Sequence, residues 1–397
     1  MRNFRHLWAL LPGLILLASC APKLIPPPRT PPAAEPQQVP PEPPKPPTAS
    51  AMGTVAGPEI GPLDEAAAAR ALTAFRISCP SLVRRTDASG LTRPEDWRSV
   101  CEEAKIVPVE GAAAWFRSAF EPVTVGDGQA FVTGYFEPEI AGCRVRQPGC
   151  EVPVYRKPAD LVDVDAAAAA AAGTPRRGRL ENGVLVPYYE RTEIENGVLS
   201  GRGLEVAWAA DAIDFFFLQI QGSGRLRMPD GSVMRIGYAG QNGREYVGIG
   251  KLMKDRGLLG PGQTSMQGIV AWLRAHPEEG RAIMRENKSY IFFQELTGPG
   301  PLGALGLPVT ARASVAADPK YVPLGAPVFL QLDGSEASGL WVAQDTGGAI
   351  RGSNRFDTFW GAGPEAALTA GGMQGRGKAV ILLPKGTLAR LHAPPQS

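Results

Sequence analysis

The pattern of apolar positions divides the chain into a helical segment and a β-rich remainder. Between residues 64 and 120, apolar residues recur at helical spacing, as in "DEAAAARALTAF", where Leu72 and Phe75 share one face. Pro94 lies in the first turn of a second expected helix. The third, "AAAWFRSAF", ends before Pro122. We therefore expect short N-terminal helices.

From residue 128 onward, short apolar runs alternate with turn signals. Asn-Gly and Asp-Gly pairs separate the runs between residues 141 and 250, which is typical of hairpins. The run "DFFFLQIQGSGRL" (214–226) predicts a buried strand, and the alanine run 165–173 predicts an exposed loop or short helix. Helices are expected again over 264–286. The later β segments, with glycine- or proline-bearing connections, favour a small closed barrel.

The first twenty residues have the pattern of an export signal. Arg2 and Arg5 precede an apolar run, 7–17, that is too short to span a bilayer. The run ends in "LLASC", which resembles a bacterial lipoprotein signal, so Cys20 is the expected lipidation site; an ordinary secretory peptide is the alternative. Residues 21–60 are rich in proline and predict a disordered linker with a reach on the order of 100 Å.

Four further cysteines lie in the body of the chain. An exported protein meets an oxidising compartment, so these thiols are expected to pair. Among the connectivities open to them, Cys79–Cys101 and Cys143–Cys150 are preferred because each closes a short loop. A zinc site is the alternative, but no C-x-x-C motif or nearby histidine supports it.

Composition excludes several classes of function. The 397 residues carry a formal net charge of only +2, which argues against a nucleic-acid partner. The three histidines lie in the signal, before a helix-starting proline and in the C-terminal tail, so a histidine base for Ser or Cys catalysis is lacking. Histidine-based zinc chemistry fails likewise, and no phosphate-binding G-x-x-x-x-G-K-[ST] loop is present. No cofactor or metal is expected.

Carboxylates remain as candidate catalytic groups. The segment "VAQDTGGAIRGSNRFDTFWGAG" places Asp345 and Asp357 among glycines, with Phe359 and Trp360 close by. Without a metal, carboxylates suit acid–base work on glycosidic bonds, and aromatic walls both raise a carboxyl pKa and stack on sugars. The alternative interpretation is that the two acids only cap turns.

At these residues the chain resembles the membrane-bound lytic transglycosylase A family. The three aspartates of that family's 3D domain match Asp318 in "SVAADPKYVPLG", Asp345 in "AQDTGGAIRG" and Asp357 in "RFDTFWGAG". Further matching motifs are "TGYFEPEI", "LQIQGSGRL", "YAGQNGREYVGIGKLM" and "SYIFFQEL". The resemblance extends from about residue 125 to 385.

The resemblance implies a mainly β fold. Residues 61–140 and 286–390 are expected to form a double-psi β-barrel domain, with the 3D region in 286–390. Residues 141–285 are expected to form an inserted second β-domain, with a substrate groove between the two.

The resemblance also implies a peptidoglycan lytic exotransglycosylase, a lyase that leaves 1,6-anhydro ends, although the residues do not distinguish exo- from endo-cleavage. Asp357 is then the single acid and base, Asp345 supports it, and Asp318 is structural. The substrate-binding residues expected on this basis are polar or aromatic and lie near the motifs: Thr133, Tyr135, Gln219, Gln221, Ser223, Phe359 and Trp360.

Two alternatives stay open. One is an inverting glycoside hydrolase that uses Asp345 and Asp357 as an acid and base pair. The other is a wall-binding module that holds glycan without cutting it. On the main interpretation the partners are peptidoglycan strands and a membrane, reached through the lipid on Cys20. The expected location is the periplasmic face of the outer membrane, where proteins of cell-wall synthesis or division are compatible partners.

Overall fold

The structure is a computed structural model that describes residues 48–260, 262–334 and 336–393. The predicted signal, Cys20 and most of the predicted linker lie outside the described residues. The linker's end at residue 60 is wrong, because helix α1 (Ala49–Met52) and strand β1 (Thr54–Ala56) are ordered. Ala49 is fully buried and β1 pairs with β2. None of the helices in the described part of the chain has the length and apolar character needed to cross a bilayer.

An eight-stranded sheet closes on itself to form a barrel. Its ring runs β17–β14–β15–β13–β16–β3 and returns to β17. The pairs β13–β15 and β3–β16 are parallel, and the other pairs of the ring are antiparallel. This ring is the closed barrel that the short β segments predict; its double-psi crossing stays a prediction. Besides β1, the strands of the sheet are β2 (Phe120–Val125), β3 (Gln129–Glu137), β13 (Ser314–Ala317), β14 (Pro327–Leu332), β15 (Gly339–Asp345), β16 (Arg355–Ala362) and β17 (Gln374–Pro384).

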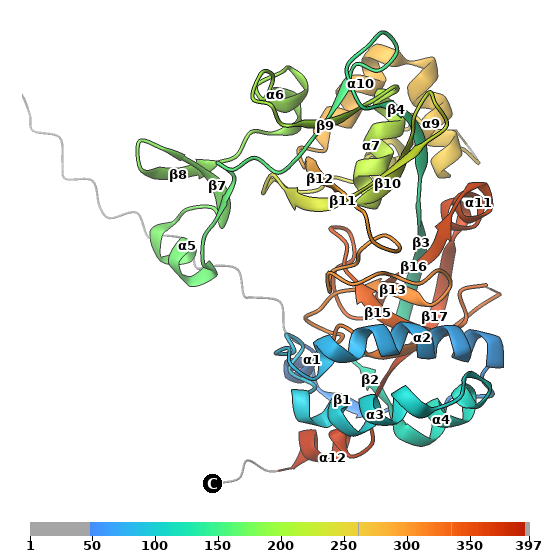
Figure 1. Ribbon diagram of the computed structural model, residues 1–397. Coiled ribbons are helices and arrows are strands. Elements are labelled where there is room, and N and C mark those ends of the chain that lie inside the picture. The colour runs from blue at the N-terminus through green and yellow to red at the C-terminus, as the bar shows by residue number, and fades with distance from the viewer. Residues whose placement is uncertain (1–47, 261, 335, 394–397) are drawn as a thin grey trace, which may run out of the picture. The chain divides into compact units, whose positions relative to one another are not determined.

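Helices pack beside the barrel, where α2 (Glu65–Leu82) lies against both α3 (Pro94–Ile106) and α4 (Ala112–Ala119) (Figure 1). Helix α2 is 18 residues long, so the expectation that the N-terminal helices are all short is wrong for it. A disulfide between Cys79 and Cys101 joins α2 to α3. The helices of this part are α2 (Glu65–Leu82), α3 (Pro94–Ile106), the 3-10 turn η1 (Val109–Gly111), α4 (Ala112–Ala119), α11 (Pro364–Gly372) and α12 (Thr387–His392).

The residues between β3 and β13 form a separate set of sheets and helices. A six-stranded sheet has the order β12–β11–β10–β4–β9–β5, and β6–β7–β8 form a small second sheet. A second disulfide joins Cys143 to Cys150. The strands are β4 (Glu139–Cys143), β5 (Val152–Tyr155), β6 (Val162–Asp163), β7 (Arg177–Glu181), β8 (Val184–Pro187), β9 (Glu205–Ala209), β10 (Ser223–Arg227), β11 (Val233–Gln241) and β12 (Ile291–Glu295). The helices are α5 (Ala166–Ala172), α6 (Arg191–Glu195), α7 (Ala212–Gln221), α8 (Ile249–Asp255), α9 (Met266–Ala275) and α10 (Pro277–Glu286).

The strand predicted over 214–226 is wrong. Asp211 caps helix α7 by accepting from the backbone N–H groups of Ile213 and Asp214, and Gly222 ends it with φ of 80°. Strand β10 starts only after this glycine. A short apolar run fits a buried strand or a buried helix equally well, and here the cap and the glycine decide for a helix.

Strand β3 connects the barrel to the inserted residues. Its first part pairs with β17, its pairing with β16 continues to Glu137, and its end also lies next to α7 and β10 (Figure 1). The backbone N–H of Phe136 donates a hydrogen bond of 3.1 Å to the side chain of Gln221 on α7. Side chains on one face of β3 can therefore reach the 3D region while its end is held by the inserted residues.

Candidate active site

Asp345 and Asp357 lie in one row across the barrel sheet. Ala316 of β13 is in register with both, and Thr133 of β3 is in register with Asp357 on its other side. Neighbouring strands are about 4.8 Å apart, so the backbones of the two aspartates are about 10 Å apart. The residue between them is Ala316, whose small methyl side chain leaves room for the two carboxyl groups on that face of the sheet.

The carboxyl group of Asp357 is held by β3. The Thr133 hydroxyl donates to Asp357 Oδ1 at 2.6 Å and accepts from Arg355 Nη2 at 2.9 Å. Because the Arg355 guanidinium can only donate, it directs the Thr133 proton toward Asp357. Burial raises the pKa of Asp357 to about 6, although Thr133 and the charge of Arg355 lower it; the charge of Asp345 adds to the rise.

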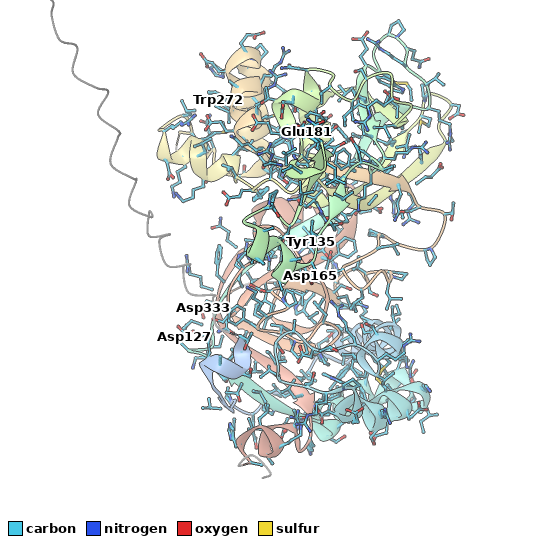
Figure 2. The ribbon with its side chains drawn as sticks, turned by 90° about the vertical axis from the view of Figure 1, so that its left-hand side faces the viewer. Asp127, Tyr135, Asp165, Glu181, Trp272 and Asp333 are labelled. Carbon is cyan, nitrogen blue, oxygen red and sulfur yellow. A yellow bond between two sulfur atoms is a disulfide. The ribbon has the colours of Figure 1, made fainter. Side chains whose placement is uncertain are left out.

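Asp345 has a different environment. The Tyr135 hydroxyl donates to its Oδ2 at 2.9 Å, and Oδ1 accepts from the backbone N–H groups of Thr346 at 2.8 Å and Ala304 at 3.0 Å. Burial raises the pKa of Asp345 to about 6 against these three hydrogen bonds, which favour the ionised form. Tyr135, labelled in Figure 2, also packs on Phe359, with ring centroids 5.0 Å apart.

The residue before Asp345 anchors this end of β15. Gln344 is fully buried, and its Nε2 donates to the Ala74 carbonyl and to the Ser78 hydroxyl on α2. Its Oε1 accepts from the Ser314 hydroxyl of β13. The position of Asp345 is therefore fixed in two ways: Gln344 holds the backbone of β15 against α2, and Tyr135 holds the Asp345 carboxyl group.

The third aspartate, Asp318, lies outside the row. It is 4% exposed, and its two oxygens accept from the backbone N–H groups of Lys320 at 3.1 Å and Gly352 at 2.8 Å. These contacts join the turn after β13 to the loop that leads into β16. Both oxygens of Asp318 therefore already accept a hydrogen bond, and its structural role stays a prediction.

Several expected binding residues are buried or are already used in other contacts of the protein. Gln219 is 2% exposed and bonds to Arg191 at 2.7 Å, so the inserted core uses its amide. Gln221 accepts from the backbone of β3, and Ser223 is buried at the start of β10. The expectation that these groups lie at strand ends is wrong for Gln219 and Gln221, which lie on α7.

The aromatic pair divides between two faces of β16. Phe359 lies on the face of Asp357, where it meets Tyr135. Trp360 points the other way, is 6% exposed, and donates to Thr358 Oγ1 at 2.9 Å inside the barrel core. Trp360 is therefore a core residue here, and the expectation that it stacks on a sugar is wrong because side chains alternate along a strand.

Two residues of the site are missing from the sequence-based set. Arg355 lies two positions before Asp357 and so on the same face of β16, a spacing that the sequence does show. Tyr246, between β11 and α8, has its pKa raised by burial and then by the charge of Asp357. Its proximity depends on the tertiary fold, and no local signal indicates it.

The arrangement suits proton transfer by a carboxyl group. Asp357 combines a pKa near neutrality with one oxygen fixed by Thr133, which leaves its other oxygen for a substrate. Over the described ranges, no cluster of three or more His, Cys, Asp or Glu side chains could hold a metal ion.

Comparisons with known proteins agree in both halves of the chain. A family model described as the MltA specific insert domain matches residues 131–294, and a model of the 3D domain matches residues 313–383. Membrane-bound lytic murein transglycosylase A of Vibrio cholerae is 29% identical over 331 residues, which are 74% of this chain and 83% of that protein.

Solved structures are similar as well. The crystal structure of membrane-bound lytic murein transglycosylase from Agrobacterium tumefaciens has a TM-score of 0.73 and 32% identity, over 81% of this chain and 95% of that one. E. coli MltA with bound chitohexaose has a TM-score of 0.61 and 27% identity, over 84% and 94%. The fold is thus the mixed, sheet-rich fold of these enzymes. The chain belongs to the membrane-bound lytic murein transglycosylase A family and carries its 3D domain.

Proposed function

We propose that this protein cleaves the β-1,4 bond between N-acetylmuramic acid and N-acetylglucosamine in peptidoglycan without adding water. Its relatives are named lytic murein transglycosylases, and one of them was solved with chitohexaose. The observation that carries the mechanism is the Asp357 carboxyl group, whose pKa is raised to about 6 and whose Oδ1 is fixed by Thr133.

In this mechanism Asp357 acts twice. At pH 7 a carboxyl with a pKa of about 6 is roughly one-tenth protonated, enough for a general acid. The acid gives its proton to the leaving glycosidic oxygen. The carboxylate that results takes the proton of the sugar's own C6 hydroxyl as that oxygen attacks C1. The C1–O4 bond breaks, the C1–O6 bond forms, and the product ends in a 1,6-anhydro ring.

Asp345 is then a supporting charge. Its oxygens accept three hydrogen bonds, which favour the ionised form and leave it poorly placed to take a proton from water. An ionised Asp345 stabilises the positive charge that develops on the sugar ring in the transition state. This difference between the two carboxyl groups favours the lytic reaction over an inverting hydrolase, which needs a second carboxylate as a general base.

Product mass on purified sacculi tests the proposal. The wild type is expected to release muropeptides with anhydro ends, which are lighter by one water than hydrolysis products. Asp357→Asn is expected to release none while still binding glycan. Hydrolysed ends would support the hydrolase, and glycan binding without release would support the wall-binding module. Undiminished turnover by Asp357→Asn would remove that residue from the mechanism.

We further propose the arrangement expected from the sequence for the rest of the molecule, with wider bounds for the inserted domain. The barrel domain has a double-psi crossing, and the inserted domain extends beyond the predicted 141–285, because β4 (Glu139–Cys143) and β12 (Ile291–Glu295) belong to its six-stranded sheet. The relatives are named membrane-bound, which is consistent with a lipid on Cys20 at the periplasmic face of the outer membrane. Metabolic labelling with a palmitate analogue, compared between the wild type and Cys20→Ala, tests the anchor.

A further inference from the structure

Tyr246 reaches from the inserted residues to the loop between the two aspartates. A Cβ atom at Gly348 would lie 3.6 Å from Tyr246 Cβ and 3.8 Å from its Cγ. Gly348 belongs to the segment that connects Asp345 on β15 to Asp357 on β16. Tyr246 therefore lies close to this segment, at a separation that leaves ordinary contact distance even for a Cβ atom at Gly348.

The backbone around Tyr246 is fixed by four hydrogen bonds. The Arg244 side chain donates to the Tyr188 carbonyl at 2.8 Å. The backbone N–H of Arg244 donates to Asn242 Oδ1, and its carbonyl accepts from Gln241 Nε2. On the other side, the Val247 N–H donates to Asn287 Oδ1 at 3.2 Å. A loop held this closely presents its side chain in one place, as a binding group requires.

The Tyr246 hydroxyl is a donor that the described part of the chain leaves unused. Burial and the charge of Asp357 raise its pKa, so the phenol stays protonated at neutral pH. The hydroxyls of Thr133 and Tyr135 are both bonded to aspartates. Within the described ranges, the Tyr246 hydroxyl has no hydrogen-bond partner, and its side chain is partly exposed.

We propose that Tyr246 donates a hydrogen bond to the acetamido carbonyl of an N-acetylated sugar bound beside Asp357. This inference rests on the proposed function and names the substrate group that the inserted residues recognise. An amide oxygen is a strong neutral acceptor, and each sugar of the glycan carries one. A site built to hydrogen-bond such a group discriminates against a sugar that lacks it.

Binding to two oligosaccharides tests this role without cleavage. In the Asp357→Asn background, Tyr246→Phe is expected to weaken binding of chitohexaose about three- to tenfold, the loss typical of one hydrogen bond. Binding of the glucosamine hexamer, which lacks the acetamido groups, is expected to stay unchanged. Equal weakening for both oligomers, or no weakening for either, would overturn the proposal.

Tyr189→Phe is the matched control. It removes a hydroxyl from another partly buried tyrosine of the inserted residues, whose ring lies under Arg179 at 4.0 Å. It is expected to leave both affinities unchanged. Digestion of sacculi by the wild type is measured separately. If the wild type releases no muropeptides, the proposed function is contradicted. If it releases them but Tyr246→Phe binds chitohexaose as tightly as its parent, only this inference is contradicted.

Discussion

The Thr133 hydroxyl donates a hydrogen bond of 2.6 Å to Asp357, its register partner on the neighbouring parallel strand. Two residues further along β3, Tyr135 makes the equivalent contact to Asp345. One strand thus controls both carboxyl groups through alternate side chains. The two contacts have opposite consequences for the pKa of Asp357, which makes them separable by experiment.

Thr133→Val is expected to move the activity profile to higher pH. The Thr133 hydrogen bond lowers the pKa of Asp357, so its loss raises that pKa further. The alkaline limb of the kcat/KM profile should move to higher pH by about 1 unit. The maximum of kcat/KM should be roughly tenfold lower, because the carboxyl group is less firmly positioned. Thr133→Ser, which keeps the hydroxyl, should behave like the wild type. A profile of unchanged shape would contradict the contact's role.

Tyr135→Phe is expected to move the same limb to lower pH. The tyrosine favours the ionised form of Asp345, and without it that carboxyl is protonated more often. The negative charge of Asp345 raises the pKa of Asp357, so a less ionised Asp345 lets the pKa of Asp357 fall. The ring contact with Phe359 is kept, so unfolding should change little. Measured pH profiles of the two β3 variants should therefore diverge; a shift in the same direction would be inconsistent with this coupling.

Asp357 is expected to reduce stability at neutral pH. Its pKa is about 6 in the folded protein and about 3.9 when unfolded, so the folded state binds more protons in between. The contribution of Asp357 to the free energy of unfolding is greatest below about pH 4. It falls as the pH rises to about 6 and is then constant. The loss is up to about 3 kcal/mol.

Asp357→Asn removes this titration. The free energy of unfolding of the variant minus that of the wild type is measured by urea unfolding at pH 4.5 and at pH 7.5. This difference should be about 1–3 kcal/mol larger at pH 7.5 than at pH 4.5. Asp318→Asn is the comparison, because that side chain already accepts two backbone hydrogen bonds and should lose stability at both values. A pH-independent difference for Asp357→Asn would show that its carboxyl is not perturbed in the folded state.

The sequence identifies the candidate catalytic aspartates better than it predicts which residues contact them. Asp345 and Asp357 stand out because other catalytic groups are absent, and the motif around Thr133 and Tyr135 indicates the right strand. What these hydroxyls contact is set by the parallel pairing of β3 with β16, which joins residues more than two hundred positions apart. Pairing over such a separation has no local signal.

Two of the errors have local causes, and one omission has its cause in the tertiary fold. The run that became α7 is apolar throughout, so its period could not distinguish a helix from a strand. Its neighbours in sequence predict that Trp360 lies near the substrate, but alternation along β16 directs it into the core. Tyr246 has no local signal in the sequence, because it lies close to Gly348 only in the tertiary fold.

Gly134 separates the two hydroxyl residues of β3, and its lack of a side chain is expected to be essential. A Cβ atom there would lie 2.9 Å from Ala370 Cα on α11 and 2.9 Å from Trp360 Nε1. Gly134→Ala must push β3 away from α11, at a cost of about 1–3 kcal/mol in stability. Because Thr133 and Tyr135 flank it, activity should fall more than tenfold even where the protein stays folded.

Gly372→Ala, at the end of the same helix, is the control for this prediction. Nothing lies within 4 Å of the Cβ position at Gly372, so the change should leave folding and activity near wild type. Thermal unfolding and release of muropeptides from sacculi, measured on both variants, separate the two effects. Full activity in a Gly134→Ala protein would mean that β3 can shift without disturbing either carboxyl group, and the close coupling between this strand and the two aspartates would then have to be abandoned.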